Sequence, residues 1–467
     1  MTGDCRHHEP GAVVGGFRLE EILHRGRMSN IWRVASASAP GKPLAMKIPL
    51  LREFDDPAAI VGFEVEAGIL PLLTGVHVPR FVASQGLSTE PYIVMEYLSL
   101  PSLRARLTDA PLPSGDVAAI GARVATALAD IHRQHVIHLD VKPSNVLFRE
   151  TGEAVLIDFG TSRHRDLPDL LAEELKTPIG TGPYISPEQI LRTRDDPRSD
   201  LFALGVVLYL LSTGRRPFGN PASVRGLRRR LYRDPSPPRM ADPDYPPWLQ
   251  EIVLRCLEVD PSARYASAEE VAAALRDPRR VALTDRARRE VRDPFWTVVA
   301  RYARSLGEAR VPAARVRGKN REPLVVAAID LAHPSEPLDA AMRAAIGRIL
   351  QPGARLACVT VLKTHRIGMD ALVDKEGRNL HVRRLVELEH WARPLGLPTS
   401  RTTYHVLGAP DPGAAILDFA SANRAAQILV GSRGSSTLRR YLGSVSSQIV
   451  AQADCTVTVV KALEASD

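Results

Sequence analysis

Cysteine is scarce in this sequence: the 467 residues include only Cys5, Cys256, Cys358 and Cys455, all far apart. No pair has the short spacing that is typical of zinc ligands or of a redox-active disulfide. We therefore expect neither a disulfide-stabilised fold nor a cysteine-ligated metal, and the pattern favours a reduced, cytoplasmic protein. Cys256, Cys358 and Cys455 lie in apolar patterns, which favours packing in a core.

Long hydrophobic runs are absent as well. The longest, Leu201–Thr213, is shorter than the roughly 20 residues that a membrane-spanning helix requires. The segment Met1–Pro10 is polar, unlike the apolar centre of a signal peptide. We therefore expect no membrane partner and no signal peptide.

Basic residues outnumber acidic ones, which gives a formal net charge of +8. Arginines gather in Arg225–Arg230 and Arg276–Arg292. Neither segment has the interleaved aromatic residues or the zinc-ligand spacing that would support nucleic-acid binding. We expect a solvated basic surface and no nucleic-acid partner.

The length of the chain indicates two or three domains, because a single core rarely extends over 467 residues. We expect one domain at 13–278, a basic linker at 279–321 and a second domain at 322–463. In the linker, Pro294–Gly307 has apolar residues at helical spacing. We expect this helix to pack on one of the domains, with partner binding as the alternative.

Two short segments carry most of the chemical information: Val136–Phe148 (VIHLDVKPSNVLF) and Ile157–Gly160 (IDFG). Phosphoryl transfer requires a carboxylate that orients the attacking hydroxyl, oxygen ligands for Mg²⁺ and a cation that offsets the charge of the moving phosphoryl group. Asp140 fits the first role and Lys142 the third. Asn145 and Asp158 fit the second. The spacing therefore predicts a phosphotransferase.

From about Phe17 to Arg276 the chain resembles the eukaryotic-like Ser/Thr protein kinases of bacteria. Residues 45–48 (AMKI) stand where that family has V-A-I-K. Residues 180–188 (GTGPYISPE) and 199–209 (SDLFALGVVLY) resemble two further family segments in the expected order. The resemblance implies an α+β bilobal kinase fold, with an N-lobe to about residue 95 and a C-lobe from about residue 99.

The resemblance also implies a site for ATP with Mg²⁺, or Mn²⁺ in its place. Lys47 would hold the phosphates and Glu66 would hold Lys47. Met95 would border the adenine, whose edge would bond the backbone of Glu96 and Leu98. Gly26 would lie at the phosphates.

Three structural pairings follow from the same resemblance. Thr181 should lie close to Asp140, and Asp200 should brace the catalytic loop. Arg264 should pair with Glu188.

The chain departs from the family at two places. Its phosphate loop, residues 24–31 (HRGRMSNI), retains only Gly26 of three glycines, which would weaken nucleotide binding or turnover. Leu139 replaces an arginine that usually binds a phosphorylated residue, so we expect activity not to require that phosphorylation. Three hydroxyls remain open as phosphorylation sites or as plain exposed groups: Thr161, Ser162 and Thr177.

The C-terminal part alternates short β-branched runs with helical patterns. The expected strands are Leu324–Ile329, Leu356–Leu362, Tyr404–Leu407, Ile428–Val430 and Thr456–Val460. The expected helices are Leu338–Leu350, Val382–Leu395, Gly413–Asn423 and Val445–Ala453. This order predicts a doubly wound, parallel α/β sheet with ligands beyond the carboxyl ends of its strands.

Residues 322–461 resemble the universal stress protein family, whose nucleotide-binding members have G-x-x-G, nine residues and then G-[ST]. Here eight residues separate Gly434 from Gly443. The resemblance implies that ATP would lie near six residues: Asp330, Val361, Gly431, Gly434, Gly443 and Ser444. The alternative is that these glycines only close a turn.

Two functional hypotheses follow. The first is an active Ser/Thr kinase that phosphorylates proteins, itself included, and is regulated by the C-terminal domain. The second is a pseudokinase that senses nucleotide as a scaffold with little turnover. The stress-protein resemblance also leaves open a homodimer through the final strand.

Overall fold

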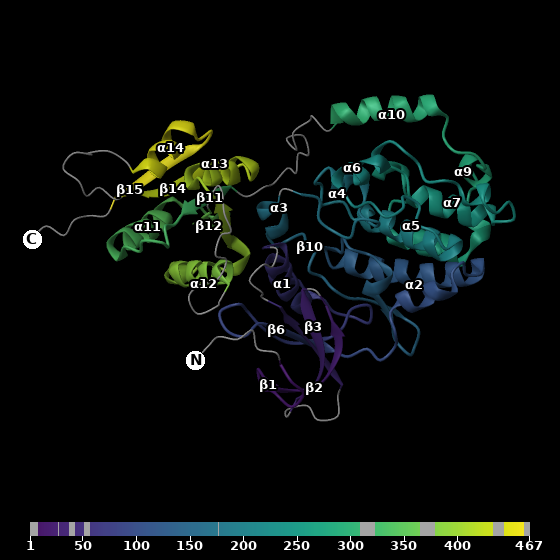
Figure 1. The fold of residues 1–467 in the computed structure, drawn as a ribbon, viewed down its shortest axis with the longest axis horizontal. Coiled ribbons are helices and arrows are strands. Elements are labelled where there is room, and N and C mark those ends of the chain that lie inside the picture. Colours follow the sequence, from purple (N-terminus) through teal and green to yellow (C-terminus); the bar gives the residue numbers. More distant parts are fainter. Residues whose placement is uncertain are drawn as a thin grey trace, which may run out of the picture.

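The computed structural model describes residues 8–26, 28–36, 43–50, 57–175, 177–308, 323–364, 379–432 and 443–461. They form a two-lobed α+β unit followed by a parallel α/β domain (Figure 1). Both predicted fold classes are therefore confirmed.

An antiparallel sheet with the order β1-β2-β3-β4-β6-β5 forms the first lobe. Burial alternates along β3, where Trp32 and Val34 point into a core. Helix α1 covers the opposite face, because its side chains cluster with Ile93 whereas Val94 belongs to the Trp32 cluster. The elements are β1 (Val13–Val14), β2 (Phe17–Arg25), β3 (Ser29–Ser36), β4 (Leu44–Pro49), α1 (Pro57–Ile69), β5 (Phe81–Gln85) and β6 (Tyr92–Glu96).

The second lobe is helical. Helix α5 lies at the centre of this lobe, and nearly all of its residues are buried. The helix ends at Gly214, which has the left-handed conformation with φ of 68°. The helices are α2 (Ser114–Arg133), α3 (Leu170–Glu174), α4 (Pro187–Ile190), α5 (Arg198–Thr213), α6 (Val224–Leu227), α7 (Pro247–Cys256), α8 (Ala268–Arg276) and α9 (Asp285–Arg288).

Two short antiparallel sheets, each of two strands, flank the loops at the junction of the lobes. Strand β7 (Val136–Ile137) pairs with β10 (Arg163–His164), and β8 (Val146–Phe148) pairs with β9 (Ala154–Leu156). The segment Val136–Phe148 therefore starts on β7 and ends on β8, and Ile157–Gly160 lies between β9 and β10.

The C-terminal domain is a parallel sheet with the order β13-β12-β11-β14-β15. The order reverses at β11, which is the predicted doubly wound topology. The strands are β11 (Leu324–Ala328), β12 (Arg355–Lys363), β13 (Thr402–Ala409), β14 (Gln427–Ser432) and β15 (Thr456–Lys461). The helices are α11 (Glu336–Ile349), α12 (Leu380–Ala392), α13 (Pro412–Ala422) and α14 (Ser444–Gln452).

Alternating strand residues give this sheet two buried faces. Ala327 and Cys358 cluster with α11 and α12, whereas Val326 and Val359 cluster with α13 and α14. The strands are therefore apolar throughout, as expected for a parallel sheet that is covered on both sides.

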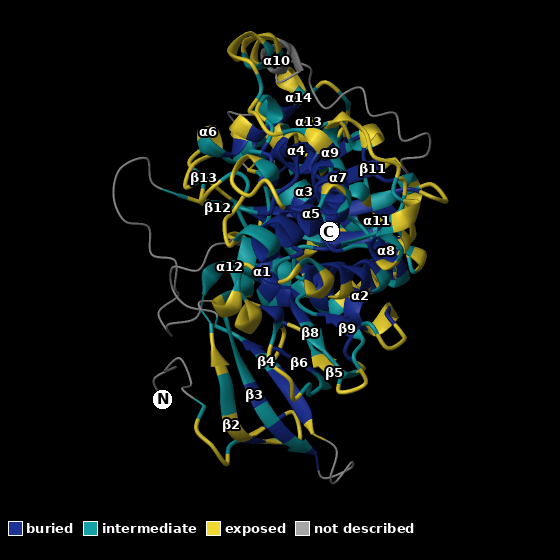
Figure 2. Ribbon diagram, turned by 90° about the vertical axis from the view of Figure 1, so that its right-hand side faces the viewer, coloured by how far each residue is buried: buried dark blue, intermediate teal, exposed yellow. Residues whose placement is uncertain are grey.

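The predicted helix at 294–307 is present as α10 (Phe295–Glu308), which runs over the second lobe (Figures 1 and 2). Tyr302 contacts the ring of Tyr232 with centroids 5.0 Å apart, and Arg301 pairs with Asp234 at 3.0 Å. These contacts join the helix to the second lobe, but Phe295, Val299 and Tyr302 of its apolar stripe are 70%, 39% and 47% exposed, so the packing of that stripe on a domain stays a prediction. The boundaries of the domains and of the linker stay predictions.

Candidate active site

Three charged side chains from separate elements meet at the base of the interlobe junction. Lys47 on β4 donates to Glu66 on α1 at 2.5 Å and to Asp158 at 2.9 Å. The backbone N–H of Phe159 donates to the second oxygen of Glu66 at 3.3 Å. The junction therefore holds an ammonium between two carboxylates, although 111 residues separate Lys47 from Asp158.

These contacts fix the charge states. The charge of Lys47 outweighs the desolvation of Asp158 and lowers the pKa of that carboxyl to about 2. Burial would lower the pKa of Lys47, but Asp158 and Glu66 more than offset it and raise that pKa above its ordinary value. Lys47 is therefore a cation, and Asp158 an anion, throughout the neutral range.

A second cluster surrounds Asp140, which is buried. Lys142 donates to one carboxylate oxygen of Asp140 at 2.6 Å and to the hydroxyl of Thr181 at 2.9 Å. The backbone N–H of Thr181 donates to the other oxygen at 2.9 Å. Thr181 is therefore close to Asp140, as predicted, and the carboxylate is held in one orientation.

Asn145 and Asp158 fit the requirements of a magnesium site. The amide nitrogen of Asn145 donates to the carbonyl and carboxylate oxygens of Asp140, at 3.1 and 3.3 Å. These bonds identify the opposite atom of the amide as its oxygen, the type of ligand that Mg²⁺ prefers. Oδ1 of Asp158 accepts the hydrogen bond from Lys47. The side chain of Asp158 is 43% exposed, so this carboxylate is accessible to a cation.

Asp200 at the start of α5 braces the loop that carries Asp140, as predicted. Its carboxylate accepts from the backbone N–H groups of His138 and Leu139, each at 2.8 Å, and contacts His132 at 2.8 Å. Leu139 has φ of 62°, a conformation that non-glycine residues rarely adopt. The fully buried Asp200 stabilises this unfavourable backbone.

The other predicted pairing also occurs. Arg264 donates to both oxygens of Glu188, at 2.7 and 2.8 Å, and both residues are buried. This bidentate pair connects the end of the segment that starts at Asp158 to the helical lobe.

The predicted adenine residues lie at the end of β6 and just beyond it. Met95 is half-buried and packs on the interlobe core. The N–H of Glu96 donates to the carbonyl of Arg80 at 2.9 Å, so a bond from this residue to adenine would use its carbonyl oxygen. Leu98 follows two residues later and is half-buried.

Gly26 lies in the turn between β2 and β3. A side chain there would place a Cβ atom 2.6 Å from the carbonyl oxygen of Ser29. The tight turn alone therefore requires glycine, whatever binds next to it.

Two features of the site could not be found from motifs. Gly62 on α1 faces Gly160, and a Cβ added to either would lie 3.1 Å from the carbonyl oxygen of the other. This close approach seats α1 against the segment after Asp158. The only sequence signal was a glycine inside a helical pattern, which carries a helix-propensity penalty unless packing requires it.

The second missed feature is Asp169, which stands at the start of α3 in the segment after Asp158. Arg194 donates to both of its oxygens at 3.1 Å, and Arg163 donates to one at 3.2 Å. Arg194 is buried and also donates to the carbonyl of Thr161 at 3.0 Å. Because Leu139 cannot bind an anion, Arg163 and Arg194 take this role by binding an acid of the segment.

In the C-terminal domain the topology brings several predicted residues to the carboxyl edge of the sheet. Asp330 follows β11 and accepts from the N–H of Ala332 at 3.1 Å. Val361 lies near the end of β12, and Gly443 caps the start of α14, whose first residue is Ser444. Gly434 lies outside the described residues.

The prediction that Gly431 follows its strand is wrong. Gly431 lies within β14, where it pairs with Val460 of β15. A Cβ atom at this position would lie 2.9 Å from the side chain of Leu338. Packing against α11 therefore accounts for this glycine. The predicted strand ended too early because β14 continues to Ser432, beyond its apolar residues.

Comparison with known proteins identifies both parts of the chain. The family model described as protein kinase domain matches residues 17–275, and that of the universal stress protein family matches residues 322–461. Over 273 residues the chain is 32% identical to a probable serine/threonine-protein kinase of Streptomyces coelicolor. The aligned region covers 56% of this chain and 40% of that protein.

Two further relatives give the same result. The serine/threonine-protein kinase Pkn1 of Myxococcus xanthus is 32% identical over 284 residues, or 60% of this chain and 40% of Pkn1. PknB of Mycolicibacterium smegmatis is 32% identical over 271 residues, or 57% of this chain and 43% of PknB. The chain thus spans about two fifths of the length of these relatives. In the part of the chain that the structure describes, no helix is long and apolar enough to cross a membrane.

Proposed function

The chain belongs to the protein kinase family, and we propose that it transfers the γ-phosphoryl group of ATP to serine and threonine hydroxyls of proteins. The observation that carries this proposal is the joint presence of the Lys47–Glu66–Asp158 and Asp140–Lys142–Thr181 clusters. All the charges that phosphoryl transfer requires are thus held within one interlobe junction.

Each side chain has a role that its contacts support. Asp140 orients the attacking hydroxyl and accepts its proton, since its carboxylate is fixed by Lys142 and the N–H of Thr181. Lys142 offsets the charge of the moving phosphoryl group. Lys47, fixed by Glu66, binds the α- and β-phosphates.

Asn145 and Asp158 would hold Mg²⁺, or Mn²⁺ in its place. When bound, the metal neutralises charge on the phosphate oxygens. Adenine would lie beside Met95 and the backbone of Glu96 and Leu98.

The test is transfer of labelled γ-phosphate from ATP to a generic protein substrate or to the chain itself. We expect Asp140→Asn to lower the transfer rate by about a hundredfold or more, because it removes the proton acceptor. The matched control is Asp109→Asn on the exposed surface of the same lobe, which should leave the rate unchanged.

Equal transfer by wild type and Asp140→Asn would contradict the proposal. The degenerate phosphate loop, with Gly26 as its only glycine, favours a second candidate, a nucleotide-sensing pseudokinase. ATP with Mg²⁺ would then raise the melting temperature, while no metal condition would give transfer.

We further propose that the C-terminal domain binds a nucleotide and regulates the kinase. Asp330, Val361, Gly443 and Ser444 support this, because they gather at the carboxyl edge of the sheet beside the strand-order reversal at β11. The edge strand β15 supports a homodimer as well, since an edge strand offers unpaired backbone groups to a second copy.

Three free cysteines among the described residues, Cys256, Cys358 and Cys455, support a cytoplasmic location.

A further inference from the structure

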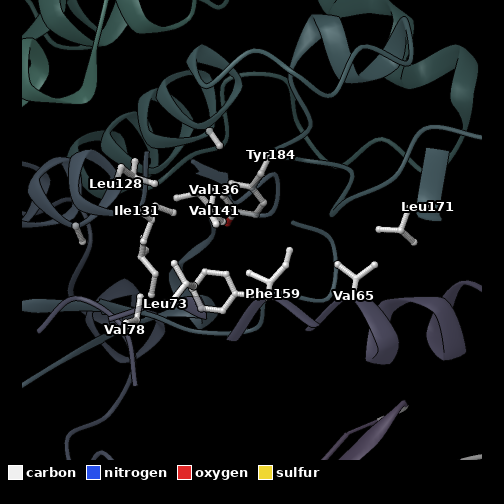
Figure 3. Packing of buried hydrophobic residues seen from close by; sticks show 14 of the residues in the cluster. Val65, Leu73, Val78, Leu128, Ile131, Val136, Val141, Phe159, Leu171 and Tyr184 are labelled. Atoms are coloured by element: carbon white, nitrogen blue, oxygen red, sulfur yellow. The ribbon is translucent and has the colours of Figure 1, made fainter. Parts of the chain in front are cut away.

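A five-residue helix, α3, lies between the kinase domain and the C-terminal domain (Figure 1). It belongs to the segment that starts at Asp158 and ends at Glu188, the activation segment of a kinase. Its Leu171 is 1% exposed and belongs to the same apolar cluster as Val65 of α1 (Figure 3). That cluster continues into the C-terminal domain through Leu388 of α12. The helix therefore belongs to an apolar cluster that extends into both domains.

The last two residues of α3 are acids that point into the C-terminal domain. Arg355 of β12 donates to one oxygen of Glu173 at 2.7 Å, and Nε2 of His405 on β13 lies 3.1 Å from the other. The amide of Asn423 donates to the carbonyl oxygen of Glu173 at 3.2 Å. Three elements of the C-terminal domain therefore bind one residue of the activation segment.

Glu174 makes a second set of contacts. One oxygen lies 3.6 Å from Nδ1 of His405 and the other lies 3.6 Å from Nε2 of His381 on α12. The side chain of Glu174 is only 6% exposed and that of His405 is fully buried. Acids are rarely buried without cationic partners, because the desolvation of a lone carboxylate is highly unfavourable. His405 of the C-terminal domain, whose pKa is raised to about 9, is such a partner.

This cluster is an ionic contact and does not have the arrangement of a metal site. Within the described ranges, no group of three or more His, Cys, Asp and Glu side chains could hold a metal ion. Glu174 instead lies between the two imidazoles, with one on each of its oxygens.

The opposite end of α3 is fixed to the kinase domain. Asp169 accepts from the N–H of Ala172 as the N-cap of α3 and is bound by Arg163 and Arg194. The helix is therefore held at its first turn by kinase arginines and at its last turn by the C-terminal domain.

The position of α3 bears directly on the catalytic cluster. Helix α3 packs against α1, and α1 carries Glu66, which holds Lys47. In the arrangement with α3 docked, Lys47 contacts both Glu66 and Asp158, and Thr181 bonds to Asp140. The docked activation segment thus coexists with a complete set of catalytic contacts.

We propose that the C-terminal domain is a built-in activator, which holds the activation segment in its catalytic arrangement by binding Glu173 and Glu174 of α3. This inference rests on the proposed kinase function and adds the contact by which it is regulated. Glu173 and Glu174 take the part of the phosphorylated residue, and the cationic groups of the C-terminal domain take the part of the arginine that binds it in other activation segments.

A double-mutant cycle in the full chain tests the proposal. The variants are Glu173→Gln, Arg355→Gln and the combination of both. Glu173→Gln removes the negative charge and retains the shape of the acid, and Arg355→Gln removes the positive charge. We expect each single change to lower kcat roughly tenfold, a typical size for coupling between sites. The KM for ATP should change much less, since no nucleotide contact is altered. The double variant should be no slower than the singles.

Hydrogen–deuterium exchange of residues 157–182 gives a readout that does not depend on turnover. We expect faster exchange there in Glu173→Gln and Arg355→Gln than in wild type. The matched control is Arg348→Gln, at an exposed position of the same domain, which should change neither kcat nor exchange.

An unchanged kcat would overturn the inference, as would a higher kcat, which would make the contact inhibitory, or additive losses in the double variant. A complete absence of transfer by wild type would refute the kinase function instead. Hydrogen–deuterium exchange would then test only whether α3 is docked on the C-terminal domain. Faster exchange in the variants would support that contact, and equal exchange would overturn it.

Discussion

Asp169 shows how one residue changes what an activation segment requires. In the absence of an arginine at Leu139, the segment has its own acid, and Arg163 and Arg194 bind it. A carboxylate that is 9% exposed and bonded by two guanidinium groups is a permanent counterpart of a phosphate.

We predict that Asp169→Asn lowers kcat by about tenfold, because it leaves Arg194 buried without its anion and frees the start of α3. Phosphatase treatment of the wild type should leave kcat unchanged. The measurement is initial rate against ATP concentration, with Asp166→Asn, in the same segment, as the matched control. A rate that falls on dephosphorylation would show that a phosphorylated residue is required after all.

At the scale of elements, local motifs predicted much of the site and little of its surroundings. Lys142 and Asn145 lie within five residues of Asp140, so their association follows from the chain itself. The pairing of Arg355 with Glu173 spans 182 residues and depends on how two domains meet. No spacing rule in one sequence encodes that orientation.

The strands and helices of the C-terminal domain were predicted in the right order, because buried parallel strands are apolar and lie between amphipathic helices. Their ends were less accurate. Strand β13 extends over Thr402–Ala409, beyond its apolar run, since ladder hydrogen bonds to β12 continue past the residues that face the core.

The contact between α3 and the C-terminal domain should also depend on pH. Burial would lower the pKa of His405, but its bonds with Glu173 and Glu174 more than offset this and raise the pKa to about 9. Burial and the nearby Glu174 raise the pKa of Glu64 on α1 to about 8. The other charged or titratable groups that face them are His381, Arg355 and Glu389.

Both pKa shifts predict that the contact becomes less stable as pH rises. The pKa of His405 is above its ordinary value, so the stabilisation is complete below about pH 6.5 and is lost as pH rises through about 9. Glu64 is protonated in the docked state at neutral pH. As pH rises through about 8 it becomes charged beside Glu174, which weakens the same contact.

We therefore predict that a change from pH 7 to pH 9 lowers the free energy of unfolding by roughly 1–3 kcal/mol, measured by urea denaturation. In His405→Gln this decrease should be smaller, because only the contribution of Glu64 remains. An equal decrease in wild type and His405→Gln would show that the pH dependence arises elsewhere in the chain.

At the scale of the whole molecule, strand β12 connects two features that are far apart in space. Its first residue, Arg355, binds Glu173 of the activation segment. Its other end carries Val361, at the edge of the sheet where Asp330 and Gly443 gather. A ligand at that edge therefore contacts the same strand that holds α3.

Because β12 takes part in both contacts, a nucleotide in the C-terminal domain should alter kinase output. We predict that the full chain binds two ATP molecules and that Asp330→Ala binds one, measured by equilibrium dialysis. The kcat of Asp330→Ala should fall by roughly fivefold at saturating ATP, in the lower part of the range for such coupling.

The matched control is Asp454→Asn, an exposed acid of the same domain that precedes β15 and so lies at the opposite, amino edge of the sheet. It should leave both the stoichiometry and kcat as in wild type. Binding of one ATP by wild type would remove the C-terminal nucleotide site, whereas two sites with equal kcat in Asp330→Ala would separate nucleotide binding from regulation. In the second case β12 would hold α3 as a fixed brace, and the activating contact through Glu173 would operate independently of ATP in the C-terminal domain.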